Sequence, residues 1–110
     1  MRLSYAIKFV SDMDSAIAFY RDTVGLKPGF QSPFWSEFET GETKLALHPA
    51  SEENPAGSVQ LGLSSEDLDR FYAEAQAKGI SFTSPPADMH GARLARFLDP
   101  EGAEITVSGV

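Results

Sequence analysis

Residues 96–107 read R-F-L-D-P-E-G-A-E-I-T-V, a pattern that predicts a β-hairpin. Alternating residues run into and out of the segment Asp99-Pro100-Glu101-Gly102. Aspartate favours the first position of a β-turn, proline presets φ at the next position, and glycine accepts the positive φ that closes the turn. A fainter copy, F-E-T-G-E-T-K-L-A-L, lies at residues 38–47. Two similar hairpins, one near the middle of the chain and one at its end, indicate a duplicated unit.

Each hairpin follows a strand pattern and a helix pattern. Residues 3–10 and 58–63 alternate as strands do, and helix starts follow at Asp12 and Asp67, each leading into an apolar stripe. The second cap and stripe lie 55 residues, half the chain, after the first. We therefore expect one domain built from two βαβββ modules, at about residues 1–50 and 57–110. Between the last helix and the final hairpin we expect a short strand at 80–83 and a proline-containing loop at 84–91.

Composition narrows the classes of protein that are possible. The chain has 110 residues, of which 42% are hydrophobic and 23% charged, as in an ordinary folded domain. A net charge of −7 argues against nucleic acid and anionic membrane as partners, because both bind basic surfaces. The absence of cysteine excludes disulfides, thiolate zinc sites and a cysteine nucleophile. No stretch resembles a signal peptide or a membrane span, so we expect a cytoplasmic protein.

Three segments carry a resemblance to a known family. They are I-K-F-V-S-D-M-D-S-A-I-A-F-Y-R-D-T-V-G-L at 7–26, G-E-T-K-L-A-L-H-P at 41–49 and R-L-A-R-F-L-D-P-E-G-A-E-I-T-V at 93–107. Together they resemble the vicinal-oxygen-chelate superfamily, which includes glyoxalase, bleomycin-resistance proteins and extradiol dioxygenases. The resemblance implies an α+β fold in which two βαβββ modules form an open, curved sheet around a cavity, with helices on the outer face. It also implies a homodimer.

The same resemblance points to four positions where metal-using members of the family place His, Glu or Gln. In this sequence they correspond to Tyr5 and Gln60 on the first strands of the modules, and to Ala46 and Thr106 on the last strands. Only Gln60 is a residue type that the family uses as a ligand, and Ala46 has no donor atom at all. We therefore expect neither a metal site nor a cofactor.

Period-two alternation places further candidates beside these positions. His48 shares the face of Ala46, where it is a candidate general base, polar contact for a ligand or displaced metal ligand. Phe9 shares the face of Tyr5, which predicts an aromatic wall, and Trp35 is a candidate for stacking on a flat ligand. Glu104 shares the face of Thr106, and we interpret it as an edge-strand charge that discourages aggregation.

Two functional hypotheses follow. The first is a metal-free binding protein of the bleomycin-resistance type, which sequesters a small, partly aromatic molecule. Its cavity is expected to be lined by Tyr5, Phe9, Trp35, His48, Gln60 and Thr106. The alternative is a lyase, isomerase or dioxygenase-type enzyme, with a relocated metal at His48, Gln60 and Glu104 or with metal-free acid–base chemistry at His48. The first is preferred because three of the four expected donors are missing.

Overall fold

The structure is a computed structural model that describes residues 1–89 and 91–109. The described residues form eight β-strands and two α-helices, so the predicted α+β class is confirmed. The chain divides into two compact units: residues 4–59, and residues 60–110 together with 1–3. His90 lies outside the described residues.

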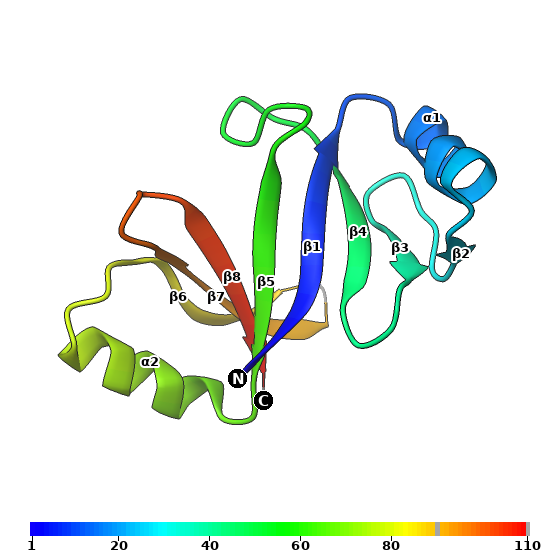
Figure 1. The fold of residues 1–110 in the computed structure, drawn as a ribbon. Helices are drawn as coiled ribbons and strands as arrows, with labels where there is room; N and C mark the ends of the chain where they lie inside the picture. Colours follow the sequence, from blue (N-terminus) through cyan, green and yellow to red (C-terminus); the bar gives the residue numbers. More distant parts are fainter. Residues whose placement is uncertain (90, 110) are drawn as a thin grey trace. The chain divides into compact units, whose positions relative to one another are not determined.

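The first unit holds a strand, a helix and three further strands. Its elements are β1 (Arg2–Val10), α1 (Met13–Ala18), the π-helical turn η1 (Phe19–Val24), β2 (Lys27–Pro28), β3 (Ser36–Glu39) and β4 (Lys44–Pro49). The strands pair in the order β2-β3-β4-β1 (Figure 1). The β1–β4 pair is parallel, and the other two pairs are antiparallel.

The second unit repeats this arrangement. Its elements are β5 (Val59–Ser65), α2 (Leu68–Ala77), β6 (Phe82–Met89), β7 (Ala92–Leu98) and β8 (Glu104–Gly109). The strands pair in the order β5-β8-β7-β6, again with one parallel pair, β5–β8, and two antiparallel pairs. The predicted pair of βαβββ modules is therefore confirmed.

Matching caps begin the two helices. Asp12 and Asp67 are the N-caps, and each uses Oδ1 to accept a hydrogen bond of 3.1 Å from the backbone N–H three residues on. Such a bond satisfies one of the amides that a helix start leaves unpaired. After the helices come Gly25 and Gly79, with φ of 89° and 90°. Both predicted helix starts are correct.

The final hairpin closes as its sequence predicts. Asp99 Oδ1 accepts hydrogen bonds of 2.9 Å from the backbone N–H groups of Glu101 and Ala103. Gly102 has a φ of 81° and donates its own N–H to the Asp99 carbonyl at 2.9 Å. The aspartate side chain thus pairs the amides of a turn that glycine alone can close without strain.

The expectation of a loop at residues 84–91 is wrong, because β6 continues to Met89. Pro85 and Pro86 lack the N–H that a central strand needs, but β6 lies at the outer end of its module's strand order and pairs only with β7 there. The pairing register also shifts between Ser84 and Ala87, so a bulge accommodates the two prolines. Pairing with β7 therefore overrides the local loop signal.

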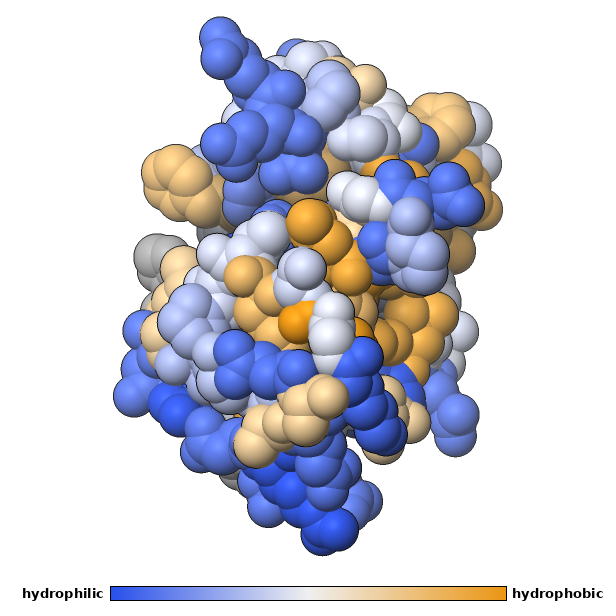
Figure 2. Space-filling view, turned by 90° about the vertical axis from the view of Figure 1, so that its left-hand side faces the viewer, coloured by the Kyte–Doolittle hydropathy of each residue, from blue (hydrophilic) through white to orange (hydrophobic). Residues whose placement is uncertain are grey.

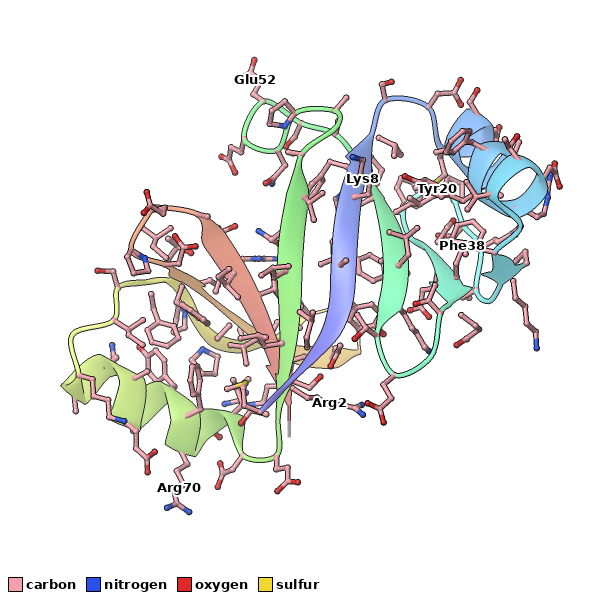
Figure 3. The ribbon with its side chains drawn as sticks, in the orientation of Figure 1. Arg2, Lys8, Tyr20, Phe38, Glu52 and Arg70 are labelled. Carbon is pink, nitrogen blue, oxygen red and sulfur yellow. The ribbon has the colours of Figure 1, made fainter. Side chains whose placement is uncertain are left out.

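In each module the helix packs on one face of the sheet. In the first module the core on this face is built on Ile17, Phe38 and Leu47, and Tyr20 meets Phe38 with ring centroids 5.9 Å apart (Figure 3). The corresponding core of the second module is built on Leu68, Ala95, Val107 and the half-buried Leu63, Phe71, Phe82 and Phe97. Every second residue of these strands therefore lies on the opposite face, which carries no helix of its module.

Large apolar side chains also reach the surface. Hydrophilic residues cover much of the face shown in Figure 2, and apolar residues are exposed near its middle. Met1, Leu3 and Leu61 of the second unit are 59%, 40% and 43% exposed. The homodimer implied by the family resemblance stays a prediction. Among the described residues, no helix has the length and apolar character needed to cross a membrane.

Phe38 and Phe34 allow a matched test of the core. Phe38 is fully buried and Phe34 is 76% exposed. We expect Phe38→Ala to lower the free energy of unfolding by about 3–5 kcal/mol, because it leaves a cavity beneath α1. Phe34→Ala should change it by no more than about 0.5 kcal/mol. Urea unfolding followed by circular dichroism measures both values, and similar losses would contradict the assigned core.

Candidate functional site

The face of the first module that lies opposite α1 is called here the helix-free face. Leu45 and Leu47 of β4 pack on the α1 side, so alternation turns Lys44, Ala46 and His48 the other way. On the parallel neighbour β1, the residues paired with these three are Tyr5, Ile7 and Phe9. The structure therefore places the first-module candidates on one face, as the alternation predicts.

Four rings form a continuous aromatic wall on this face. Trp35, just before β3, contacts Tyr5 with ring centroids 5.5 Å apart and His48 at 6.3 Å, and His48 contacts Phe9 at 5.3 Å. All three contacts are edge-to-face, the arrangement that aromatic quadrupoles favour. Phe9 is only 5% exposed and supports the wall from beneath, whereas Tyr5 and Trp35 are half-buried and His48 is exposed.

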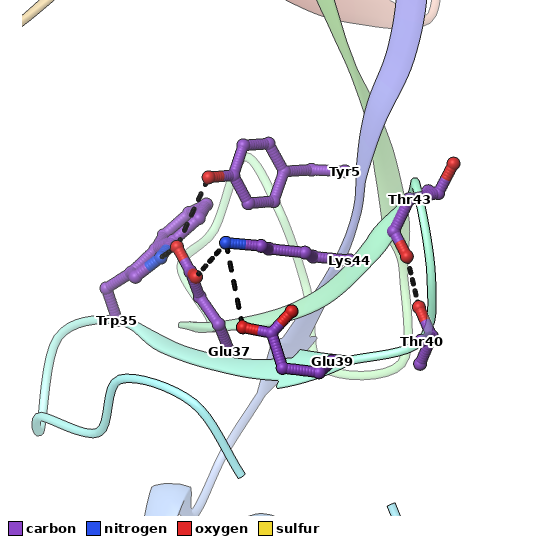
Figure 4. A network of polar contacts seen from close by, with 7 residues as sticks. All are labelled: Tyr5, Trp35, Glu37, Glu39, Thr40, Thr43 and Lys44. Carbon is purple, nitrogen blue, oxygen red and sulfur yellow. Dashed lines mark hydrogen bonds and ion pairs between the residues drawn. The ribbon is translucent and has the colours of Figure 1, made fainter. Parts of the chain in front are cut away.

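One carboxylate holds the polar edge of the wall (Figure 4). Glu37 Oε1 accepts hydrogen bonds from the Tyr5 hydroxyl at 3.2 Å and from Trp35 Nε1 at 2.9 Å. Its other oxygen, Oε2, accepts from Lys44 Nζ at 3.3 Å, and Glu39 lies 3.8 Å from the same ammonium. Glu37 thus fixes the orientation of two rings and neutralises a cation.

This environment changes the pKa of two groups. Burial raises the pKa of the Tyr5 phenol above its usual 10.0, and the charge and hydrogen bond of Glu37 raise it further. The hydrogen bond to Glu37 raises the pKa of the Lys44 ammonium, and the charges of Glu37 and Glu39 act in the same direction. Tyr5 therefore stays neutral, and Lys44 charged, over the physiological range.

The geometry also indicates the tautomer of His48. Its Nδ1 lies 2.8 Å from the carbonyl oxygen of Pro49. A carbonyl oxygen only accepts, so Nδ1 must carry the proton, and in the neutral ring Nε2 is left with a free lone pair. In this tautomer Nε2 can accept a hydrogen bond from a ligand.

The second module carries a polar chain on its own helix-free face. Thr106 donates its hydroxyl to Gln60 Oε1 at 2.8 Å, Gln60 Nε2 donates to Glu104 at 3.2 Å, and Thr83 donates to the other Glu104 oxygen at 2.7 Å. Our interpretation of Glu104 as an edge-strand charge is wrong, because β8 pairs with both β5 and β7. Gln60 and Thr106 lie together as predicted. Both polar atoms of the Gln60 amide, however, already bond to side chains of the same module, Thr106 and Glu104.

The two arginines of β7 lie on opposite faces, as alternation predicts. Arg93 reaches the helix side, where it pairs with Asp69 of α2 at 2.7 Å and with Asp88 at 3.7 Å. Arg96 is half-buried, shares the face of Thr106 through the β7–β8 register, and makes no ion pair with any residue of the described ranges.

A metal ion does not fit the four family positions. Ala46 offers no donor, the neutral Tyr5 phenol and the Thr106 hydroxyl are poor metal ligands, and both amide atoms of Gln60 already make hydrogen bonds. Within residues 1–89 and 91–109, no group of three or more His, Cys, Asp or Glu side chains is arranged to hold a metal. The relocated set also fits poorly, because the Glu104 carboxylate already accepts from Gln60 and Thr83.

A surface pocket of about 270 Å³ lies elsewhere in the first module, beside the start of α1. Its lining includes Lys8, Asp12 and Gly57, and of the four wall residues only Phe9 contributes to it. Lys8 Nζ is held by the Gly57 carbonyl at 3.1 Å. The pocket is open and offers no converging reactive groups, so the aromatic wall is the better candidate site.

The sequence did not reveal two features of this site. One is the role of Lys44, and the other is the convergence of three hydrogen-bond donors on Glu37. Glu37 stands out in the sequence only as an acid able to reach inward. The available signal was the alternation of side chains along each strand. Lys44 lies two residues before Ala46, and Glu37 lies two residues after Trp35, so each shares a face with a predicted site position. Their opposite charges on the same face of neighbouring strands favour an ion pair.

The sequence and the fold agree on the family. The sequence profile of the Glyoxalase/Bleomycin resistance protein/Dioxygenase superfamily matches residues 2–107. This chain therefore belongs to that superfamily. Among curated proteins it is similar to the uncharacterized protein YraH of Bacillus subtilis strain 168, with 29% identity and 92% coverage of both chains.

Solved structures show the same fold with different stated activities. One neighbour is described as an NAD-dependent benzaldehyde dehydrogenase from Legionella pneumophila, with a TM-score of 0.80, 19% identity, and coverage of 96% of this chain and 97% of that one. Another is methylmalonyl-CoA epimerase from Mycobacterium tuberculosis, with a TM-score of 0.79, 16% identity, and coverage of 98% and 87%. At such identities the likeness establishes the fold, and the activity must be argued from the site.

Titration of Tyr5 tests the Glu37 network. We expect its pKa, from the ultraviolet absorbance difference between the wild type and Tyr5→Phe, to lie above 10. In Glu37→Gln it should fall towards the ordinary value, because the charge is gone, but remain above it, because burial is the larger cause. A Tyr5 pKa that does not change in Glu37→Gln would show that the two side chains do not interact.

Proposed function

We propose that this chain is a binding protein for a small, partly aromatic molecule, which it holds by stacking and apolar contact and does not transform. The observation that carries the proposal is the aromatic wall of Tyr5, Phe9, Trp35 and His48. Aromatic side chains that are half-exposed and already ordered supply contact area at little entropic cost on binding. Glu37 supplies that order by holding the edges of two rings.

In this proposal the wall contacts the flat part of the ligand. Trp35 and Tyr5 are the direct contacts, Phe9 supports them from beneath, and His48 contributes an exposed ring with a polar edge. On the helix-free face of the second module, Gln60 and Thr106 are proposed to contact polar groups of a ligand, for which the single hydrogen bond between them must be exchanged. The proposal requires no metal, in keeping with the poor donor set at the family positions.

Catalysis at His48 is the second candidate function. The hydrogen bond from Nδ1 to Pro49 leaves Nε2 as the basic nitrogen on an exposed edge, which is the arrangement that a general base needs. A lyase or isomerase reaction of this kind would use His48 without a metal. The described residues place no acid within ion-pair distance of His48 to support it, which favours binding over catalysis.

Fluorescence of the single tryptophan tests binding. We expect several members of a panel of neutral aromatic compounds to quench or shift Trp35 emission saturably, and Tyr5→Leu to weaken binding by about tenfold, because one wall contact is lost. Phe19→Leu is the matched control, because Phe19 is 50% exposed on η1. No response to any compound would remove Trp35 from the proposed site.

Elemental analysis separates the two functions. Protein purified without chelator should contain less than stoichiometric amounts of any divalent metal, because the candidate positions lack free donors. Recombinant wild type and His48→Ala should therefore give the same metal content. A stoichiometric metal that disappears in His48→Ala would support the enzyme with a relocated metal.

A further inference from the structure

The hydrogen-bond donors of the aromatic wall are turned towards the protein. The Tyr5 hydroxyl and the Trp35 indole N–H both donate to Glu37, and His48 Nδ1 donates to the Pro49 carbonyl. These rings therefore offer a ligand their π faces, the Tyr5 oxygen lone pairs and the Nε2 lone pair of neutral His48. Each of these features carries negative partial charge.

Beside the wall, carboxylates outnumber the ammonium group that they bind. Glu37 and Glu39 lie 3.3 and 3.8 Å from the ammonium of Lys44, so two carboxylates surround one cation. The balance of the three is one negative charge, within a chain whose net charge is −7. Lys27, directly opposite Glu39 on the outer strand β2, is a further cation of this face, but it is not part of the Glu37 network beside the rings. An anionic ligand group at the wall would meet lone pairs and the Glu37 carboxylate, together with the Lys44 ammonium that is already paired with it.

We propose that the aromatic wall selects ligands that carry a protonated amine or another strong hydrogen-bond donor, and that it rejects carboxylates of the same shape. This inference rests on the proposed function and specifies its ligand class. An ammonium group is attracted to indole and phenol faces, and it can also donate to His48 Nε2 and to the Tyr5 oxygen. A carboxylate would lose water without gaining donors in return.

Three biphenyl compounds that differ in one substituent test the proposal. Aminomethylbiphenyl is a cation at neutral pH, hydroxymethylbiphenyl is neutral and biphenyl carboxylate is an anion. We expect the amine to bind about tenfold more tightly than the alcohol, and the carboxylate about tenfold or more weakly than the alcohol. Isothermal titration calorimetry measures all three dissociation constants without relying on Trp35 emission.

A pair of variants with the same charge change isolates the local effect. Glu37→Gln keeps a side-chain oxygen to accept from Tyr5 and Trp35 but removes the charge beside the wall. Glu42→Gln removes one charge from the exposed turn between β3 and β4. We expect Glu37→Gln to reduce the preference for amine over alcohol to about threefold or less, and Glu42→Gln to leave it unchanged. Thermal melts check that both variants are folded.

The outcomes separate this inference from the function on which it rests. If no biphenyl compound binds, the proposed binding function fails. If all three bind equally, or the carboxylate binds most tightly, the binding function stands and the ligand class is overturned. Tight carboxylate binding that is lost in Arg96→Gln would assign recognition to Arg96 of the second module instead.

Discussion

The two faces of each strand serve different purposes, and this constraint governs the rest of the structure. In the first module α1 packs on the face that carries Phe38 and Leu47. Because side chains alternate, residues next to these core positions must lie on the opposite face. Glu37 and His48 flank core residues in sequence and reach the aromatic wall for this reason. A shift of one residue in either strand would bury these polar groups under the helix.

On the helix-free face of the first module, one carboxylate organises the side chains around it. Glu37 gathers Tyr5, Trp35 and Lys44, which come from three different segments of the module. A metal gathers donors and leaves an open coordination position for substrate. The Glu37 oxygens instead accept hydrogen bonds from donors of the protein, and the ring surfaces beside them remain exposed. Under the proposed function, these ring surfaces supply the stacking contacts.

The elements that sequence reasoning predicted correctly rest on local signals. The turn at Asp99 and the caps at Asp12 and Asp67 each bond to backbone within four residues, so short motifs suffice to identify them. The strand through Pro85 and Pro86 depends on pairing with β7, which no local pattern reveals. The donors around Glu37 likewise converge through strand register and side-chain conformation. The alternation of side chains predicts which residues share a face of the sheet, but it does not predict which of them form hydrogen bonds with one another.

The buried methyl group of Ala46 limits which side chains this position can accept. It is fully buried, and the Tyr5 and Trp35 rings pack against the cluster that it forms with Ile7 and Phe9. The methyl group thus offers no donor atom, and it is small enough for the aromatic rings to pack against it. A larger acidic side chain in place of Ala46 would collide with these rings. A donor can therefore be introduced here only together with smaller residues at Tyr5 or Trp35.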